Sequence, residues 1–244
     1  MHAARYDRQV SFSHGTKNRL TRHDLGRFTS DTLFDRLGRV VCGVGRLPRK
    51  ELFEAWEVAR RVRRCCRGGR VVDIAGGHGL LAHLMLLLDD TSPEAVIVDP
   101  APPACGAALS EAIVAEWPRL CGRVHVRVDD IRDVPMNAGD VIVSSHACGA
   151  LTDHILDAAV AASARVAVLP CCQDLATCDA GPLAGWLDGP TAVDAMRAIR
   201  LAAAGFTVKT QTIPGTITPK NRLLIGIPNN EAPQASKVKL GPGG

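Results

Sequence analysis

The chain has 244 residues, of which 46% are hydrophobic and 22% charged, and it carries a formal net charge of +4. This balance suits one globular domain with an appended segment, and it permits a nucleic-acid partner without requiring one. Aromatic residues make up only 4%, which argues against a broad base-stacking platform. The nine cysteines are odd in number and follow no secretory signal, so we expect free thiols in a reducing, cytoplasmic setting.

The first part of the chain predicts an N-terminal extension over residues 1–45. Its first twenty residues are expected to be poorly ordered, and short helices are expected between residues 22 and 38. Pro48 then opens a strong helix over residues 49–66. The arginines on its polar face indicate either a solvated surface or a patch that contacts RNA phosphates. The later apolar run at 80–88 is too short to span a bilayer, so no membrane association is predicted.

Residues 70–83 predict a buried strand that ends at Asp73, a glycine loop, and an apolar helix from about Leu80. Glycines let the backbone approach a ligand closely, and a helix N-terminus offers free N–H groups. This order is typical of a cofactor loop. A tight strand–helix turn without any ligand is the alternative.

Two cofactors fit this loop in different ways. The spacing Gly77-x-Gly79-x-x-Ala82 matches the dinucleotide fingerprint, with Asp99 as a ribose ligand, and would indicate an NAD(P)-dependent oxidoreductase. Asp73 argues against it, because a carboxylate inside the loop repels a pyrophosphate. The same carboxylate would attract a cation, such as the ammonium group of a methionine moiety.

The remainder of the chain alternates strands and helices, which implies a parallel sheet. Strands are expected at 95–98, 124–128, 140–143 and 165–169, helices at 107–117, 154–163 and 192–204, and an antiparallel pair at 206–212 and 223–227. Asp99 and Asp130 follow the second and third strands, where they could bind ribose hydroxyls and an adenine amino group. Residues 229–244 are polar and predict a disordered tail.

The acids after strands one, two and three follow the order used by class I S-adenosylmethionine (SAM) methyltransferases. The loop Asp73-x-Ala75-x-Gly77-x-Gly79 resembles their motif I, with Ala75 where the first glycine usually stands. Alanine is a costly choice there if the position needs a positive φ.

The phrases after the fourth and fifth strands narrow the resemblance. The phrase His146-Ala-Cys148-Gly149, together with Pro170-Cys171-Cys172, resembles the branch that includes the methyltransferase-like 25 proteins and the glutathione S-transferase C-terminal-domain-containing protein. That branch is related to tRNA acceptor-stem 2′-O-methyltransferases. The resemblance covers roughly residues 46–227.

This resemblance implies a Rossmann-like seven-stranded α/β sheet of the class I methyltransferase type over residues 46–228, with the N-terminal helical extension before it. It implies SAM as the cofactor and the following site. The residues that bind the cofactor would be Asp73, Ala75, Gly76, Gly77, Gly79, Asp99, Asp130 and His146. The catalytic residues would be His146, Cys148, Cys171 and Cys172. The substrate would be bound by Arg49, Lys50 and Asp153. RNA is the favoured methyl acceptor, followed by a protein side chain or a small molecule.

Several interpretations remain open beside this one. The cysteines could simply pack the strand ends as small apolar residues, and Asp153 could cap the next helix. A zinc site built from His146, the three cysteines and Cys178 is an alternative, but no Cys-x-x-Cys spacing is present, so no metal is predicted. A non-catalytic RNA-binding module with the SAM fold is the last alternative, and it rests on the arginine helix.

Overall fold

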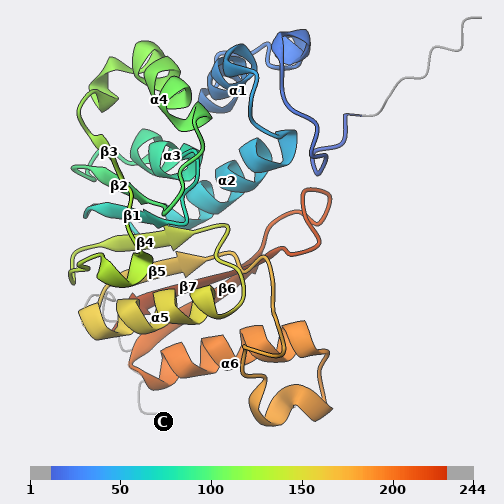
Figure 1. Ribbon diagram of the computed structural model, residues 1–244, viewed down its shortest axis with the longest axis vertical. Helices are drawn as coiled ribbons and strands as arrows, with labels where there is room; N and C mark the ends of the chain where they lie inside the picture. The colour runs from blue at the N-terminus through green and yellow to red at the C-terminus, as the bar shows by residue number, and fades with distance from the viewer. Residues whose placement is uncertain (1–11, 230–244) are drawn as a thin grey trace, which may run out of the picture.

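The structure is a computed structural model that describes residues 12–229 (Figure 1). The predictions for residues 1–11 and for the tail from residue 230 lie outside the described residues. A single seven-stranded sheet has the order β3-β2-β1-β4-β5-β7-β6. Its strands are β1 (Val71–Ile74), β2 (Ala95–Val98), β3 (Val124–Arg127), β4 (Val141–Ser144), β5 (Arg165–Val168), β6 (Phe206–Thr212) and β7 (Arg222–Pro228).

The first five strands are parallel, and β7 pairs antiparallel with both β5 and β6. Strand order reverses between β1 and β4, which is the point where open α/β sheets bind ligands. The predicted Rossmann-like sheet with a closing antiparallel pair is therefore confirmed. Among residues 12–229, no helix combines the length and the apolar content needed to cross a bilayer.

Helices cover both faces of the sheet. Those on one face are α1 (Leu33–Val44), α2 (Arg49–Val62), α3 (Leu80–Leu88) and α4 (Cys105–Glu116), and those on the other are α5 (Ala150–Ala162) and α6 (Gly189–Ala203) (Figure 1). Short 3-10 turns lie at η1 (Arg22–Arg27), η2 (Pro118–Leu120), η3 (Ile131–Asp133) and η4 (Gly181–Gly185). The arrangement gives three layers, with the sheet in the middle.

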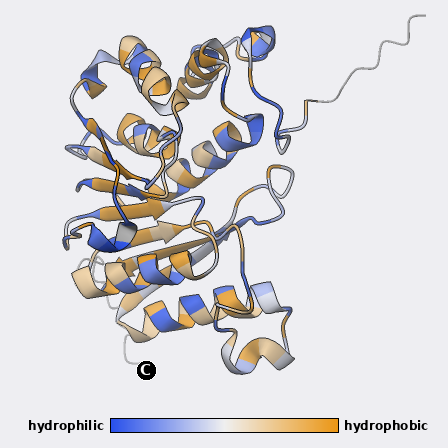
Figure 2. Ribbon diagram, in the orientation of Figure 1, coloured by the Kyte–Doolittle hydropathy of each residue, from blue (hydrophilic) through white to orange (hydrophobic). Residues whose placement is uncertain are grey.

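Each face of the sheet has its own hydrophobic core. Hydrophobic residues run along the strands, whereas α5 and α6 alternate between hydrophobic and polar positions (Figure 2). Helix α3 differs, because every residue from Leu80 to Leu87 is buried. It packs between the sheet and the helices α2 and α4, so its continuous apolar run is a core helix.

The N-terminal extension, which includes α1, packs into the core that α2, α3 and α4 share with the sheet. Its residues Leu20, Phe28 and Leu37 are buried in this core together with residues of the sheet. Helix α1 extends to Val44, beyond the predicted limit at residue 38, and Gly45 ends it at φ +69. The extension is thus attached to the methyltransferase-type sheet by shared apolar burial.

The arginine helix is shorter than expected and does not present a continuous basic face. Helix α2 ends at Val62, and the next residue, Arg63, is only 2% exposed. Its guanidinium pairs with Asp89 at 3.2 Å and donates to the Met85 carbonyl, so it joins the end of α2 to the loop after α3. Burial lowers the pKa of Arg63 to about 10. Arg63 is therefore a structural residue and unavailable to a phosphate.

Candidate functional site

The glycine loop leaves β1 at Asp73 and enters α3 at Leu80. Three of its residues have positive φ, namely Ala75 at +52°, Gly77 at +53° and Gly79 at +78°. A Cβ added at Gly79 would lie 2.2 Å from Cδ1 of Ile97, so only glycine fits at the start of α3. The loop therefore lies directly against the side chain that β2 contributes.

Ala75 occupies the position where a glycine was expected from the motif. Its left-handed conformation costs an L-residue roughly 1–2 kcal/mol. The loop therefore stores a small amount of backbone strain at Ala75.

Two carboxylates organise this loop. Oδ2 of Asp73 accepts from the Ala82 amide at 3.1 Å, and the residue is only 1% exposed. Burial, aided by the nearby charge of Asp99, raises the pKa of Asp73 to about 7. Asp99 accepts from the amides of Gly77 at 3.0 Å and Ala101 at 2.8 Å. Asp99 therefore fixes the loop after β1 to the loop after β2.

Asp73 lies in a cavity of about 20 Å³ that is also lined by Glu51, His78, Ser145 and His146. Oγ of Ser145 is buried there and has no hydrogen-bond partner. The His78 ring and the Glu51 carboxylate form a close contact. Burial alone would raise the pKa of Glu51, but the hydrogen bond with His78 lowers it. This contact restricts the cavity.

Sequence reasoning did not assign roles to Glu51, His78 or Ser145. A titratable histidine between two loop glycines was the available signal for His78. Glu51 comes from the first turn of α2, and only the packing of α2 on α3 places it at the cavity.

His146 follows β4 and lines the same cavity as the glycine-loop residues Ala75 and Gly76. The residue keeps an exposed surface, but the surrounding protein removes enough hydration to lower its pKa. The carboxylates of Glu54 and Glu51 oppose this effect. The ring is therefore neutral near pH 7 and able to accept a proton.

Cys148, Cys171 and Cys172 come together at the carboxyl ends of β4 and β5, and we call them the thiol cluster. Their Sγ atoms all lie within 4.8 Å of one another, and the Sγ atoms of Cys148 and Cys171 are 2.7 Å apart. Burial and the neighbouring Cys148 raise the pKa of Cys171. Cys178 lies apart, with its sulfur 3.5 Å from Nη2 of Arg197.

The predicted substrate-binding residues have partners within the chain. Arg49 lies 3.6 Å from the centre of the Phe12 ring and 3.5 Å from Asp24, so it faces the N-terminal segment. Lys50 pairs with Glu54 at 3.2 Å. Their contact with a substrate stays a prediction.

Two predicted acids also form ion pairs. Asp153 binds Arg197 at 2.6 Å and contacts Arg200, so its carboxylate is engaged within the chain. Asp130 pairs with Arg132 at 2.7 Å and lines an open cavity of about 520 Å³. Its predicted contact with adenine stays a prediction, as does a substrate role for Asp153.

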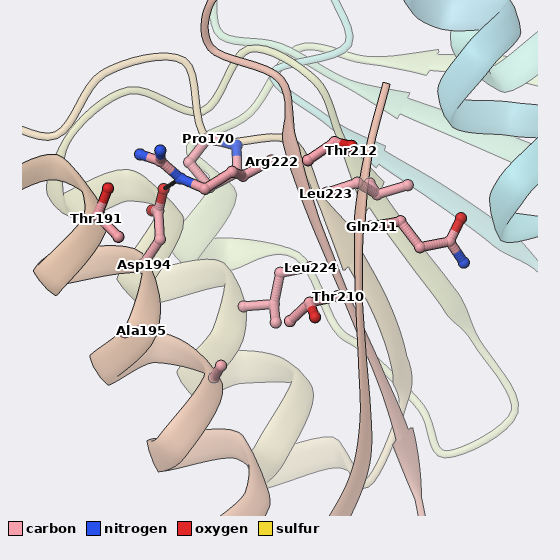
Figure 3. A pocket seen from close by; sticks show the side chains of 11 residues that line it. Pro170, Thr191, Asp194, Ala195, Thr210, Gln211, Thr212, Arg222, Leu223 and Leu224 are labelled. Atoms are coloured by element: carbon pink, nitrogen blue, oxygen red, sulfur yellow. Dashed lines mark hydrogen bonds and ion pairs between the residues drawn. The ribbon is translucent and has the colours of Figure 1, made fainter. Parts of the chain in front are cut away.

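A second cavity of about 520 Å³ lies between α6 and the strands β6 and β7 (Figure 3). Thr191 and Asp194 line it from the helix, and Gln211 and Arg222 line it from the strands. Arg222 pairs with Asp194 at 2.8 Å across one end. This cavity lies in the opposite helical layer from the glycine loop, and no motif in the sequence predicts it.

The sheet order, the glycine loop and the acids at the strand ends together define a class I methyltransferase fold. A family model described as a methyltransferase domain matches residues 52–178, more than half of the chain. The chain belongs to this methyltransferase-domain family and is an enzyme of the SAM-dependent methyltransferase type. No curated protein matches it.

Solved structures show similarity at low identity. A candidate RNA methyltransferase from Pyrococcus horikoshii is 17% identical over 74% of this chain and 84% of its own, with a TM-score of 0.45. An O-methyltransferase family protein from Burkholderia thailandensis is 20% identical over 84% of this chain and 62% of its own, with a TM-score of 0.49. A precorrin-6y C5,15-methyltransferase from Geobacter metallireducens is 10% identical over 71% of this chain and 87% of its own, with a TM-score of 0.46.

Proposed function

We propose that the glycine loop holds SAM. Asp73 would bind the amino group of the methionine moiety, Asp99 the ribose hydroxyls and Asp130 the adenine amino group. The observation that carries the proposal is the buried carboxylate of Asp73, whose one recorded hydrogen bond among residues 12–229 comes from the Ala82 amide. Oγ of Ser145 beside it also has no partner. A cationic ligand with further polar atoms would satisfy both groups.

The cofactor requires the cavity at Asp73 to open. A volume of about 20 Å³ holds no more than a water molecule. Because His78 and Glu51 close this cavity from the loop and from α2, their side chains have to separate when the methionine moiety enters. The glycine loop and α2 therefore act together in cofactor binding.

The sulfonium methyl group of SAM is already activated, so the protein mainly positions the acceptor in line with it. An imidazole nitrogen of His146 would take the proton from an acceptor that must lose one, and its lowered pKa leaves it neutral for this task. The thiol cluster would border the acceptor side, because Cys148 follows His146 by two residues.

RNA is the favoured acceptor within this proposal, and the proposal includes membership of the methyltransferase-like 25 branch. The net charge of +4 supports an anionic acceptor, and Arg64, exposed after α2, is available to phosphates. A protein side chain or a small molecule is the second class of acceptor.

Calorimetric titration of the full chain with SAM, S-adenosylhomocysteine and NADH tests the cofactor. We expect both adenosyl ligands to bind and NADH to give no heat of binding. Binding of NADH alone would overturn the proposal in favour of an oxidoreductase.

A radiolabelled-methyl assay over RNA, protein and metabolite fractions then tests the acceptor. Label in RNA, with transfer that falls steeply as salt rises, supports the RNA assignment. Label confined to the protein or metabolite fraction contradicts it. RNA binding without any label would indicate a non-catalytic module.

A further inference from the structure

The thiol cluster has the spacing of a metal site. Its three Sγ atoms lie within 4.8 Å of one another. A tetrahedral zinc ion with Zn–S bonds of about 2.3 Å holds its sulfur ligands about 3.8 Å apart. The Sγ atoms of Cys148 and Cys171 are 2.7 Å apart and would separate by about 1 Å on binding. Small rotations of the side chains would then bring all three sulfur atoms to one cation.

The backbone fixes the two cysteine-bearing loops against each other. Cys148 and Cys172 form a parallel bridge that extends the pairing of β4 and β5 beyond the strand ends. The Gly149 amide donates to the Cys172 carbonyl at 3.1 Å. Gly149 itself has φ +56 and ψ −133, a conformation in which other residues are strained. The backbone therefore fixes the two loops from which the three thiols extend.

A buried arginine supports both loops from below. Arg197, on α6, is 1% exposed and donates to the Gly149 carbonyl at 2.9 Å. It also pairs with Asp153 at 2.6 Å and with Asp194 at 3.2 Å. Asp194 in turn accepts from the side chain of Gln173 at 3.0 Å. Metal ligands are commonly held by such a supporting layer of hydrogen bonds.

The cluster borders open space on its other side. Cys148 and Cys172 line the cavity of about 520 Å³ together with Asp130, His154 and Asp174. Zinc sites with three protein ligands keep a fourth position for water or a substrate atom, whereas closed structural sites use four protein ligands. A cation on these three thiols would have such a position facing the cavity.

We propose that Cys148, Cys171 and Cys172 bind one zinc ion, or a similarly thiophilic divalent cation, with the fourth coordination position open to the cavity lined by His154. Binding replaces the three thiol protons, which leave to solvent, with three metal–sulfur bonds. Of the zinc ligands considered from the sequence, this proposal keeps the three cysteines and leaves out His146 and Cys178, because both lie elsewhere. His146 lies among Glu51, Lys50 and His78, and Cys178 lies against Arg197.

The test uses the full chain, purified anaerobically with a phosphine reductant and loaded with Zn²⁺ or Co²⁺. After dialysis against a weak chelator we expect one metal ion per chain, and intense thiolate-to-cobalt absorption with the visible bands of a tetrahedral ion. Cys148→Ser, Cys171→Ser and Cys172→Ser should each lower retained metal at least tenfold. Cys121→Ser is the matched control, because that cysteine is exposed after η2 and outside the cluster, and it should retain one ion.

Three results would overturn the metal site: reduced chain without stoichiometric metal, metal retained in all three cluster variants, or a disulfide between cluster cysteines that persists in reductant. Circular dichroism checks each variant for folding, and chelator competition on the unmodified chain gives a readout that needs no variant.

The open position has its own test. Addition of imidazole should shift the cobalt bands of the unmodified chain. Unchanged bands, together with loss of metal in His154→Ala, would show that His154 is a fourth protein ligand and that no position is open. Since the site does not depend on SAM, calorimetry with SAM on metal-free chain separates the two proposals. Binding of SAM without any zinc site would overturn only this inference.

Discussion

The glycine loop and the thiol cluster lie at the same edge of the sheet but are built differently. The loop is held by its own backbone, through hydrogen bonds from Gly77 to Asp99 and from Ala82 to Asp73. Its cavity measures about 20 Å³. The thiol cluster is supported by the buried side chain of Arg197 and borders a cavity of about 520 Å³.

This difference separates a site that must open from a site that is already accessible. Under the proposed function, entry of SAM at Asp73 would require the His78–Glu51 contact to break, so part of the binding free energy would be used for that rearrangement. A cation reaches the thiol cluster without such a step. The two sites should therefore respond differently to substitutions of their supporting residues.

The largest effect is expected from Arg197→Leu. It leaves Asp153 and Asp194 without a buried partner, and we expect a loss of about 3 kcal/mol in the free energy of unfolding by urea. Arg200→Leu is the matched control, because Arg200 is 43% exposed and also pairs with Asp153. Its loss should stay below about 1 kcal/mol. Equal losses in the two variants would show that the burial of Arg197 adds nothing to the free energy of unfolding beyond what an exposed arginine contributes.

Asp99→Ala should weaken the binding of S-adenosylhomocysteine at least 100-fold. The substitution removes two hydrogen bonds from the ribose hydroxyls to the Asp99 carboxylate. At about 1.5 kcal/mol each, their loss weakens binding by about 3 kcal/mol. Calorimetry measures the affinity, and circular dichroism should show an intact fold. Asp129→Ala removes an acid after β3 that pairs with Arg127, and should bind normally. Unchanged affinity in Asp99→Ala would exclude Asp99 from the cofactor site.

The sequence predicted the glycine loop well because its signals are local. Positive φ at Gly77 and Gly79 is a property of those residues, and the strand before them is an apolar run. The positions of Asp73 and Asp99 follow from parallel strands ending at one edge. The strained conformation of Ala75 confirms the expectation that alanine is a costly choice there.

The remaining features depend on pairs that are distant in the chain. Arg197 lies 48 residues from Gly149, to which it donates, and no local pattern distinguishes it from a surface arginine on α6. The burial of Arg63 likewise depends on Asp89, which follows α3. The sequence named the thiols as catalytic candidates, but their mutual distances required the register of β4 and β5.

Binding at the glycine loop should depend on pH through Asp73. With its pKa raised to about 7, the carboxyl is protonated below that pH and must ionise to hold an ammonium group. Affinity for S-adenosylhomocysteine should therefore fall about tenfold per pH unit below 7 and level off above it. Calorimetry between pH 5.5 and about 8 measures this slope. Asp73→Asn should bind weakly at every pH, with a flat profile.

The same group affects stability with a defined sign. Because the pKa in the folded chain exceeds the ordinary 3.8, the folded chain binds more protons than the unfolded chain between the two values. The contribution of Asp73 to the free energy of unfolding is thus greatest below pH 4 and is lost as the pH rises through about 7. A difference between the native chain and Asp73→Asn that does not change over this range would contradict the raised pKa.

The smallest effect concerns the strain at Ala75. Ala75→Gly removes a left-handed penalty of about 1–2 kcal/mol, while the added freedom of glycine in the unfolded chain offsets about 0.5–1 kcal/mol. We expect a net gain of about 0.5 kcal/mol in urea unfolding. Gly77→Ala is the reverse substitution and serves as the control. Open space surrounds the Cβ position of residue 77, so the positive φ of +53° is the main source of strain for an alanine there. By the same two terms with reversed sign, Gly77→Ala should lose about 0.5 kcal/mol. A loss in Ala75→Gly would mean that the methyl group of Ala75 makes packing contacts that outweigh the strain.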